Sequence, residues 1–229
     1  MNRSDILALF GIILGIPGLL IALFSDAAIV AVIFLILCGV LFWVRWWLNQ
    51  PLYTLICVEK VLTIEDVGGK KAKLIRFHEG VANHRGLNEF WCRNISADGE
   101  ISNVLVDNHA PYETERRAGD LQVCTRFRQS LDRGERFSMT LSYDLTDSFL
   151  RTPEAIIHVV ETKTKKLKMI VILPPSRPAT NALATLSFGG LPHKRLFPPR
   201  LTGQVMGERI EFEIKAPKLG AEYRLEWDW

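Results

Sequence analysis

The first 48 residues contain two long apolar stretches with almost no polar positions. Residues 6–24 hold no charged residue, and residues 27–48 hold only Arg45, close to their end. About 20 apolar helical residues cross the roughly 30 Å core of a bilayer, so both stretches have the length of a membrane-spanning helix. A cleaved signal peptide would have a shorter apolar region and a small-residue cleavage site. The pattern predicts a membrane α-hairpin of two N-terminal transmembrane helices over residues 1–49.

The second apolar stretch ends in a cluster of aromatic residues around one arginine. Trp43, Trp46 and Trp47 stand where tryptophan favours the headgroup level, and the long side chain of Arg45 can reach the same level. The loop between the stretches has no basic residue, whereas basic residues flank the outer ends. The positive-inside rule therefore predicts a two-pass membrane protein with both termini in the cytoplasm.

The first apolar stretch also carries small residues at helical spacing, Gly11, Gly15 and Gly18. Glycines at this spacing let helix backbones approach closely in lipid. The partner is either the second apolar helix or another copy of the chain, and the second case predicts a homo-oligomer.

From residue 50 onward, apolar and polar positions alternate with a period of two. The segments "RFSMTLSYDL", "RIEFEIK" and "EYRLEWDW" are typical of strands with one buried face. The predicted inward residues are Phe137, Met139, Leu141, Tyr143, Leu145, Ile210, Phe212, Ile214, Tyr223, Leu225, Trp227 and Trp229. Short strands with turns at regular spacing predict an all-β, antiparallel β-sandwich or barrel of about 9–11 strands over residues 50–229, on the cytosolic side.

Three turns in this part predict β-hairpins. Asp98-Gly99 stands between "FWCRNI" and "EISNVLV", and "TKTKK" stands between "AIIHVV" and "LKMIVIL". Met206-Gly207-Glu208 stands between "LTGQV" and "RIEFEI". We expect the two strands that flank each turn to pair with each other.

Charge and motifs narrow the function. The 28 Lys and Arg residues nearly balance 25 Asp and Glu residues, which gives no reason to expect duplex nucleic acid as a partner. Without a CxxC pair, Cys38, Cys57, Cys92 and Cys124 are interpreted as reduced, buried thiols. The patterns GxSxG, HExxH and the P-loop are missing, so no enzyme, metal or cofactor is predicted. His158, within an apolar strand, is interpreted as a structural histidine.

Basic residues gather in several clusters, and three interpretations stay open. Lysines at hairpin tips are commonly solvated or protect sheet edges. Beneath a membrane, some could contact anionic headgroups. Alternatively, arginines and one aromatic residue could line a pocket for a nucleotide-type ligand, with the arginine forks on phosphate and the ring on a base. The residues of this predicted site are Arg126, Arg128, Arg195, Phe197 and Arg200.

The order of parts, two N-terminal apolar stretches followed by one β-rich domain, resembles the two-transmembrane, β-strand-rich effectors of bacterial nucleotide-signalled (CBASS-type) anti-phage systems. In that family a β-barrel domain senses a cyclic nucleotide, and the membrane helices assemble to disrupt the inner membrane. The resemblance covers the order of parts over the whole chain and assigns no binding residue.

Three functional hypotheses follow. The leading one is a non-enzymatic effector in the lipid bilayer, whose β-domain recognises a ligand or partner and drives oligomerisation of the helices. The second is a passive membrane anchor that presents a protein-binding β-sandwich. The third is a membrane-bound enzyme, which a deep pocket with a Cys–His or carboxylate pair would indicate.

Overall fold

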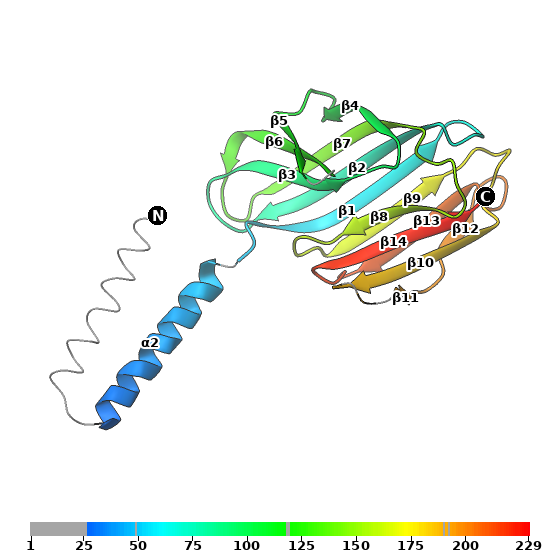
Figure 1. Ribbon diagram of the computed structural model, residues 1–229. Helices are drawn as coiled ribbons and strands as arrows, with labels where there is room; N and C mark the ends of the chain where they lie inside the picture. Colours follow the sequence, from blue (N-terminus) through cyan, green and yellow to red (C-terminus); the bar gives the residue numbers. More distant parts are fainter. Residues whose placement is uncertain (1–26, 49, 118–119, 190, 192) are drawn as a thin grey trace. The chain divides into compact units, whose positions relative to one another are not determined.

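The computed structural model of the chain describes residues 27–48, 50–117, 120–189, 191 and 193–229. The chain divides into two units, Met1–Gln50 and Pro51–Trp229, and each is described here by itself. In the first unit, helix α2 runs from Ala27 to Leu48 (Figure 1). Its side chains are described over residues 32–45.

The structure contradicts the prediction of two transmembrane helices. In the described part of the chain, no helix is both long enough and apolar enough to cross a membrane. The first apolar stretch, residues 6–24, lies outside the described residues.

This correction extends to every prediction that depended on two spans. The two-pass topology with cytoplasmic termini is wrong, and so is the membrane effector function, because both require spanning helices. The passive anchor and the membrane-bound enzyme also placed the chain in a membrane, so neither is carried forward.

The residues named for these membrane roles are placed only in part. Gly11, Gly15 and Gly18 lie outside the described residues, as do the side chains of Trp46 and Trp47. Trp43 and Arg45 are exposed on α2.

The second unit consists of β-strands in three sheets (Figure 1). The largest sheet has seven strands in the order β12-β13-β9-β1-β2-β7-β4. Their bounds are β12 (Arg200–Thr202), β13 (Arg209–Lys215), β9 (Lys166–Ile172), β1 (Tyr53–Ile64), β2 (Lys71–Ala82), β7 (Arg136–Thr146) and β4 (Glu100–Val106).

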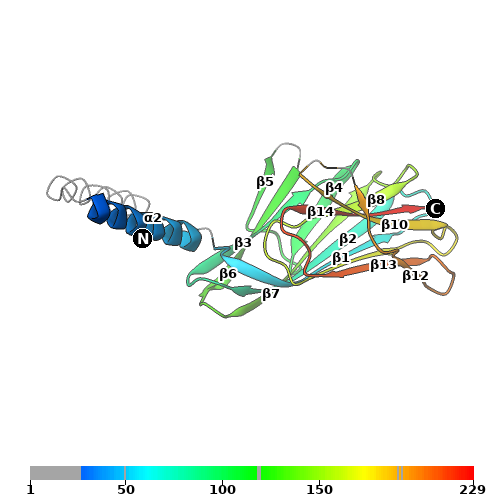
Figure 2. The same cartoon turned by 90° about the horizontal axis from the view of Figure 1, so that it is seen from below.

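Two smaller sheets complete the unit. One has the order β11-β10-β14-β8, and the other has the order β3-β6-β5. Their bounds are β11 (Lys194–Arg195), β10 (Asn181–Phe188), β14 (Ala221–Asp228), β8 (Glu154–Val159), β3 (Leu87–Ile95), β6 (Asp120–Leu131) and β5 (Glu113–Arg117). Figures 1 and 2 show the sheet with β14 layered face to face on the seven-stranded sheet.

One apolar core joins the layers. The predicted inward residues of β7 are all buried, and Tyr223, Leu225 and Trp227 of β14 are at most 1% exposed. They pack with buried residues of β1, β9 and β13 in a single cluster. The alternation of the sequence therefore predicts the buried faces correctly, because successive residues of a strand point to opposite faces.

The arrangement of strands differs from the prediction. The described residues form fourteen strands instead of about 9–11, and β1 pairs with β9 in parallel, so the seven-stranded sheet is mixed. Of the three predicted hairpins, only β12–β13 forms. The Asp98-Gly99 turn leads from β3 to β4, which belong to different sheets, and "TKTKK" likewise leads from β8 to β9. These two turns carry the chain between the layers, because turn residues reverse the chain without fixing which strand it joins.

Candidate functional site

Two basic side chains lie on the buried faces of neighbouring strands. In β1, Lys60 stands in the inward phase between Val58 and Leu62 and is 2% exposed. In β2, Arg76 stands between Leu74 and His78 in the inward phase and is 5% exposed. Lys60 and Arg76 are direct partners in the antiparallel β1–β2 register, so they are neighbours on one face. Two basic side chains are therefore buried side by side.

These two cations are only partly compensated. Within the described residues, neither takes part in an ion pair. Lys60 Nζ donates to the carbonyl oxygen of Ile157 at 2.6 Å. Arg76 Nη1 and Nη2 donate to the carbonyl oxygens of Arg93 and Asn94, both at 3.3 Å, while its buried Nε has no partner in this part of the chain. Burial, and secondly Arg76, hold the pKa of Lys60 well below its ordinary value.

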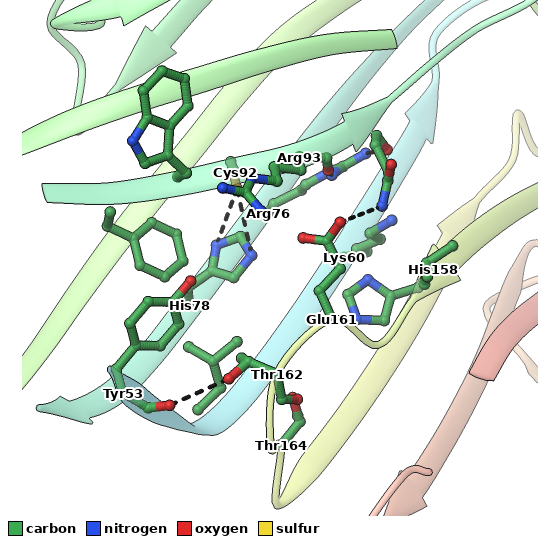
Figure 3. A pocket seen from close by; sticks show the side chains of 15 residues that line it. Tyr53, Lys60, Arg76, His78, Cys92, Arg93, His158, Glu161, Thr162 and Thr164 are labelled. Atoms are coloured by element: carbon green, nitrogen blue, oxygen red, sulfur yellow. Dashed lines mark hydrogen bonds between the residues drawn. The ribbon is translucent and has the colours of Figure 1, made fainter. Parts of the chain in front are cut away.

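Lys60 and Arg76 line two cavities. The smaller has a volume of about 50 Å³, and its lining also includes Tyr53, His78 and Glu161 (Figure 3). The larger has a volume of about 430 Å³ and is lined by residues of β2, β7, β8 and β14 and by the connections around them. Small-molecule sites commonly have volumes of about 300–1,000 Å³, so the larger cavity has the size of a ligand pocket.

The larger cavity also carries negative charge. The carboxylates of Asp98, Asp120, Glu154 and Glu222 are part of its lining. Glu154 is buried, its Oε1 accepts the backbone N–H of Arg151, and burial raises its pKa. Lys60, Arg76 and Arg224 thus share one cavity with four carboxyl groups. These carboxyl groups oppose a dianion more strongly than a singly charged anion.

A thiol and an imidazole lie beside the cations. Cys92 Sγ is 3.6 Å from His78 Nε2 (Figure 3). Burial lowers the pKa of His78 to about 3, assisted by Arg76 and Lys60, and burial raises the pKa of Cys92 to about 11. Both groups are therefore neutral near pH 7. A cysteine nucleophile acts as the thiolate, so the pair is held in an unreactive state.

The lowered pKa of His78 predicts a loss of stability in acid. An unfolded histidine titrates near pH 6.5, so between pH 6.5 and about 3 the unfolded chain binds more protons than the folded one. The stability present above pH 6.5 should fall through this window, by up to about 5 kcal/mol, since one pKa unit corresponds to about 1.4 kcal/mol. Urea unfolding at several pH values should show a flatter profile for His78→Gln. An unchanged profile would mean that His78 is protonated in the folded protein.

Two of the predicted ligand-binding residues line neither of the two cavities of Lys60 and Arg76. Arg126 and Arg128 stand on β6 and line a different cavity of about 640 Å³. Arg126 Nη2 is 2.9 Å from Glu89 Oε1, and its guanidinium lies 3.8 Å from the centre of the Tyr112 ring. Arg126 is therefore already engaged by protein groups.

The other three predicted residues lie in other parts of the fold. Arg195 of β11 lines a fourth cavity of about 330 Å³. The Phe197 ring stacks on Phe212 with centroids 5.2 Å apart, and Arg200 of β12 stands opposite Glu211 of β13. The structure thus brings the five residues to no common pocket: Arg126 and Arg128 share one cavity, and Arg195 lines another.

The sequence did contain a signal for Lys60 and Arg76. In "YTLICVEKVLTI" the residues that face inward include Val58, Lys60 and Leu62, so a basic side chain interrupts an otherwise apolar face. The alternation of β2 places Arg76 and His78 in its inward phase in the same way. Half-buried His158, interpreted as structural, also lines the smaller cavity.

Comparison with known proteins gives no family for this chain. No protein-family model and no curated protein matches it. Solved structures with related shapes include an M1 zinc metallopeptidase from Deinococcus radiodurans, at 12% identity over 76% of this chain and 42% of that chain, with a TM-score of 0.44. Native yeast LTA4 hydrolase is similar at 11% identity over 77% and 29%, also with a TM-score of 0.44. This chain spans less than half the length of either structure, and we draw no functional argument from them.

Proposed function

We propose that the unit Pro51–Trp229 is a binding module that recognises a ligand through a carboxylate group held by Lys60 and Arg76. The observation that carries the proposal is the pair itself: two adjacent cations, at most 5% exposed, without an ion-pair partner in the described residues and with Arg76 Nε unbonded. Burying an unpaired charge costs several kcal/mol. We infer that a binding role of the pair compensates for this cost.

The chemistry of the cavity favours a carboxylate. An arginine fork and an ammonium group are natural donors to a planar anion, and charge-assisted hydrogen bonds are about twice as strong as neutral ones. Asp98, Glu154 and Glu222 in the same cavity would repel the second charge of a phosphate dianion. The neutral Cys92–His78 pair supports a binding role rather than a catalytic one.

The test is a series of monocarboxylates from acetate to phenylbutyrate, each compared with its amide at constant ionic strength. Carboxylates should raise the melting temperature of the full-length protein, because a ligand that binds only the folded state stabilises it, and amides should not. Arg76→Lys keeps the charge but loses the fork, so its affinity should fall about ten-fold. Arg128→Lys is the matched control and should bind like the wild type. Equal shifts with acids and amides would overturn the proposal.

Binding should also take up protons. The free protein holds the pKa of Lys60 below its ordinary value, and a bound carboxylate would favour the charged form and raise it again. Above the lowered pKa of Lys60, affinity should therefore decrease as pH rises. Titration calorimetry in two buffers with different ionisation enthalpies measures this uptake. Proton release on binding would contradict the assigned role of Lys60.

A further inference from the structure

Two unpaired sheet edges border the cavities around Lys60 and Arg76. In the sheets formed by the described residues, β3 pairs only with β6, and β8 pairs only with β14. Residues of both β3 and β8 line the smaller and the larger cavity. We call the space between these two strands, above Lys60 and Arg76, the slot.

The backbone carbonyls at the slot are bonded to side chains instead of to a strand. Lys60 bonds the carbonyl of Ile157 in β8, and Arg76 bonds those of Arg93 and Asn94 in β3. In an antiparallel pair, the N–H and C=O of one residue point to the same side. The N–H of Ile157 therefore also points away from β14 and into the slot. The N–H of Ile157 is therefore a group that another strand could use, while the carbonyls of Ile157, Arg93 and Asn94 already accept from Lys60 and Arg76.

The backbone of β3 is irregular beside the slot. Asn94 adopts a φ of 53°, and the β3–β6 register shifts between Cys92 and Ile95, which is the signature of a bulge. Asn94 Nδ2 donates to Glu161 Oε1 at 2.6 Å, so a side-chain hydrogen bond joins β3 to the segment after β8. Asparagine is one of the residue types that adopt the left-handed region most readily.

The cavity sizes indicate how a ligand would be oriented. The larger cavity accommodates a ligand of several groups, whereas the smaller, of about 50 Å³, holds little more than one or two waters or a carboxylate. A chain that enters by the larger cavity must therefore end at Lys60 and Arg76. The carboxylates of Asp98, Glu154 and Glu222 can accept from its N–H groups or from a basic side chain.

We propose that the slot binds the carboxyl-terminal end of an extended polypeptide as an added strand between β3 and β8, with its terminal carboxylate on Lys60 and Arg76. This inference rests on the proposed carboxylate recognition and names the ligand class. Main-chain bonds to a sheet edge give such a complex its affinity, and capture of the terminal carboxylate fixes its register. A basic residue before the last residues of the peptide would complement the carboxylates of the larger cavity.

The test uses the full-length protein and the peptide acetyl-Lys-Val-Thr-Val. The free acid should bind at least ten-fold more tightly than the C-terminal amide, and replacing its Lys by Glu should weaken binding further. N-methylation of successive peptide nitrogens should weaken binding at alternate positions only, because the groups of a strand face its two neighbours in turn. Amides of β3 and β8 should exchange more slowly in the complex. Arg128→Met should bind the peptide like the wild type.

The outcomes of these tests distinguish the added strand from the carboxylate recognition on which it rests. If monocarboxylates bind but the peptide does not, or if N-methylation has no effect at any position, the added strand is wrong and carboxylate recognition stands. If neither monocarboxylates nor the peptide bind, both proposals fail.

Discussion

Replacing Lys60 by methionine is expected to stabilise the fold and to abolish carboxylate binding. Lys60 is 2% exposed and makes one hydrogen bond, to the carbonyl of Ile157. Methionine keeps most of the apolar stem and removes a buried charge whose desolvation costs several kcal/mol. The lost hydrogen bond costs about 1 kcal/mol, and water can replace it because Ile157 is 41% exposed. The net gain should be about 1–3 kcal/mol.

Urea unfolding of Lys60→Met measures this gain, and calorimetry with phenylbutyrate measures the loss of binding. Arg128→Met changes the net charge equally at an exposed position and should leave both quantities unchanged. A Lys60→Met variant that is destabilised yet binds normally would show that Lys60 serves only to satisfy the carbonyl of Ile157.

The same variant should change the pH dependence of stability. Below its lowered pKa, Lys60 is charged in the folded and unfolded states alike, and the cost of burying it is fully present. Between that pKa and about 10.4, the unfolded chain binds more protons than the folded one, so the stability of the wild type rises with pH. The advantage of Lys60→Met should therefore be largest below the lowered pKa of Lys60 and become smaller as the pH rises above it toward about 10.

Gly69→Ala is expected to destabilise the protein by about 3 kcal/mol or more. Gly69 has a φ of +71°, and a Cβ there would lie 1.8 Å from the carbonyl oxygen of Phe149. Phe149 is buried, donates its N–H to the carbonyl of Gly69, and lines the larger cavity. The alanine must therefore displace backbone that forms the wall of the proposed site, and carboxylate affinity should fall with stability.

Gly86→Ala is the matched control for the backbone conformation. Gly86 has a φ of +80° with open space around the added Cβ, so this variant should lose only about 1–2 kcal/mol, the cost of a left-handed alanine. Equal losses for the two variants would show that conformation alone, and not the contact with Phe149, determines the effect. Urea unfolding of both variants decides between them.

Individual strands were the part of this fold that the sequence predicted best. The alternation in "RFSMTLSYDL" identified five buried residues of β7, and that in "EYRLEWDW" identified three buried residues of β14. The β-rich fold agrees with the sandwich in the prediction. The predicted membrane-spanning helices do not agree with the structure, because no helix in the described part of the chain is long and apolar enough to cross a membrane.

The candidate site was missed for a different reason. Clusters of basic residues along the chain predicted a ligand-binding site at Arg126, Arg128, Arg195, Phe197 and Arg200. Adjacent positions in a strand face opposite sides, and neighbours in a sheet can be distant in sequence, so charge density along the chain says little about a pocket. A single cation in the inward phase of an apolar strand was the better signal.

The sequence by itself determined which face of each strand is buried, because that depends only on alternation. It also determined that Lys60 would share the buried face with Val58 and Leu62. Pairing between distant strands was decided only by the tertiary structure: β1 joins β9 in parallel, and β3 and β8 each lie in a different sheet from the strand that follows them. Turn residues reverse the chain but do not choose its partner, since the partner is set by packing over the whole core. The slot between β3 and β8, with its two cations, exists because neither predicted hairpin formed there.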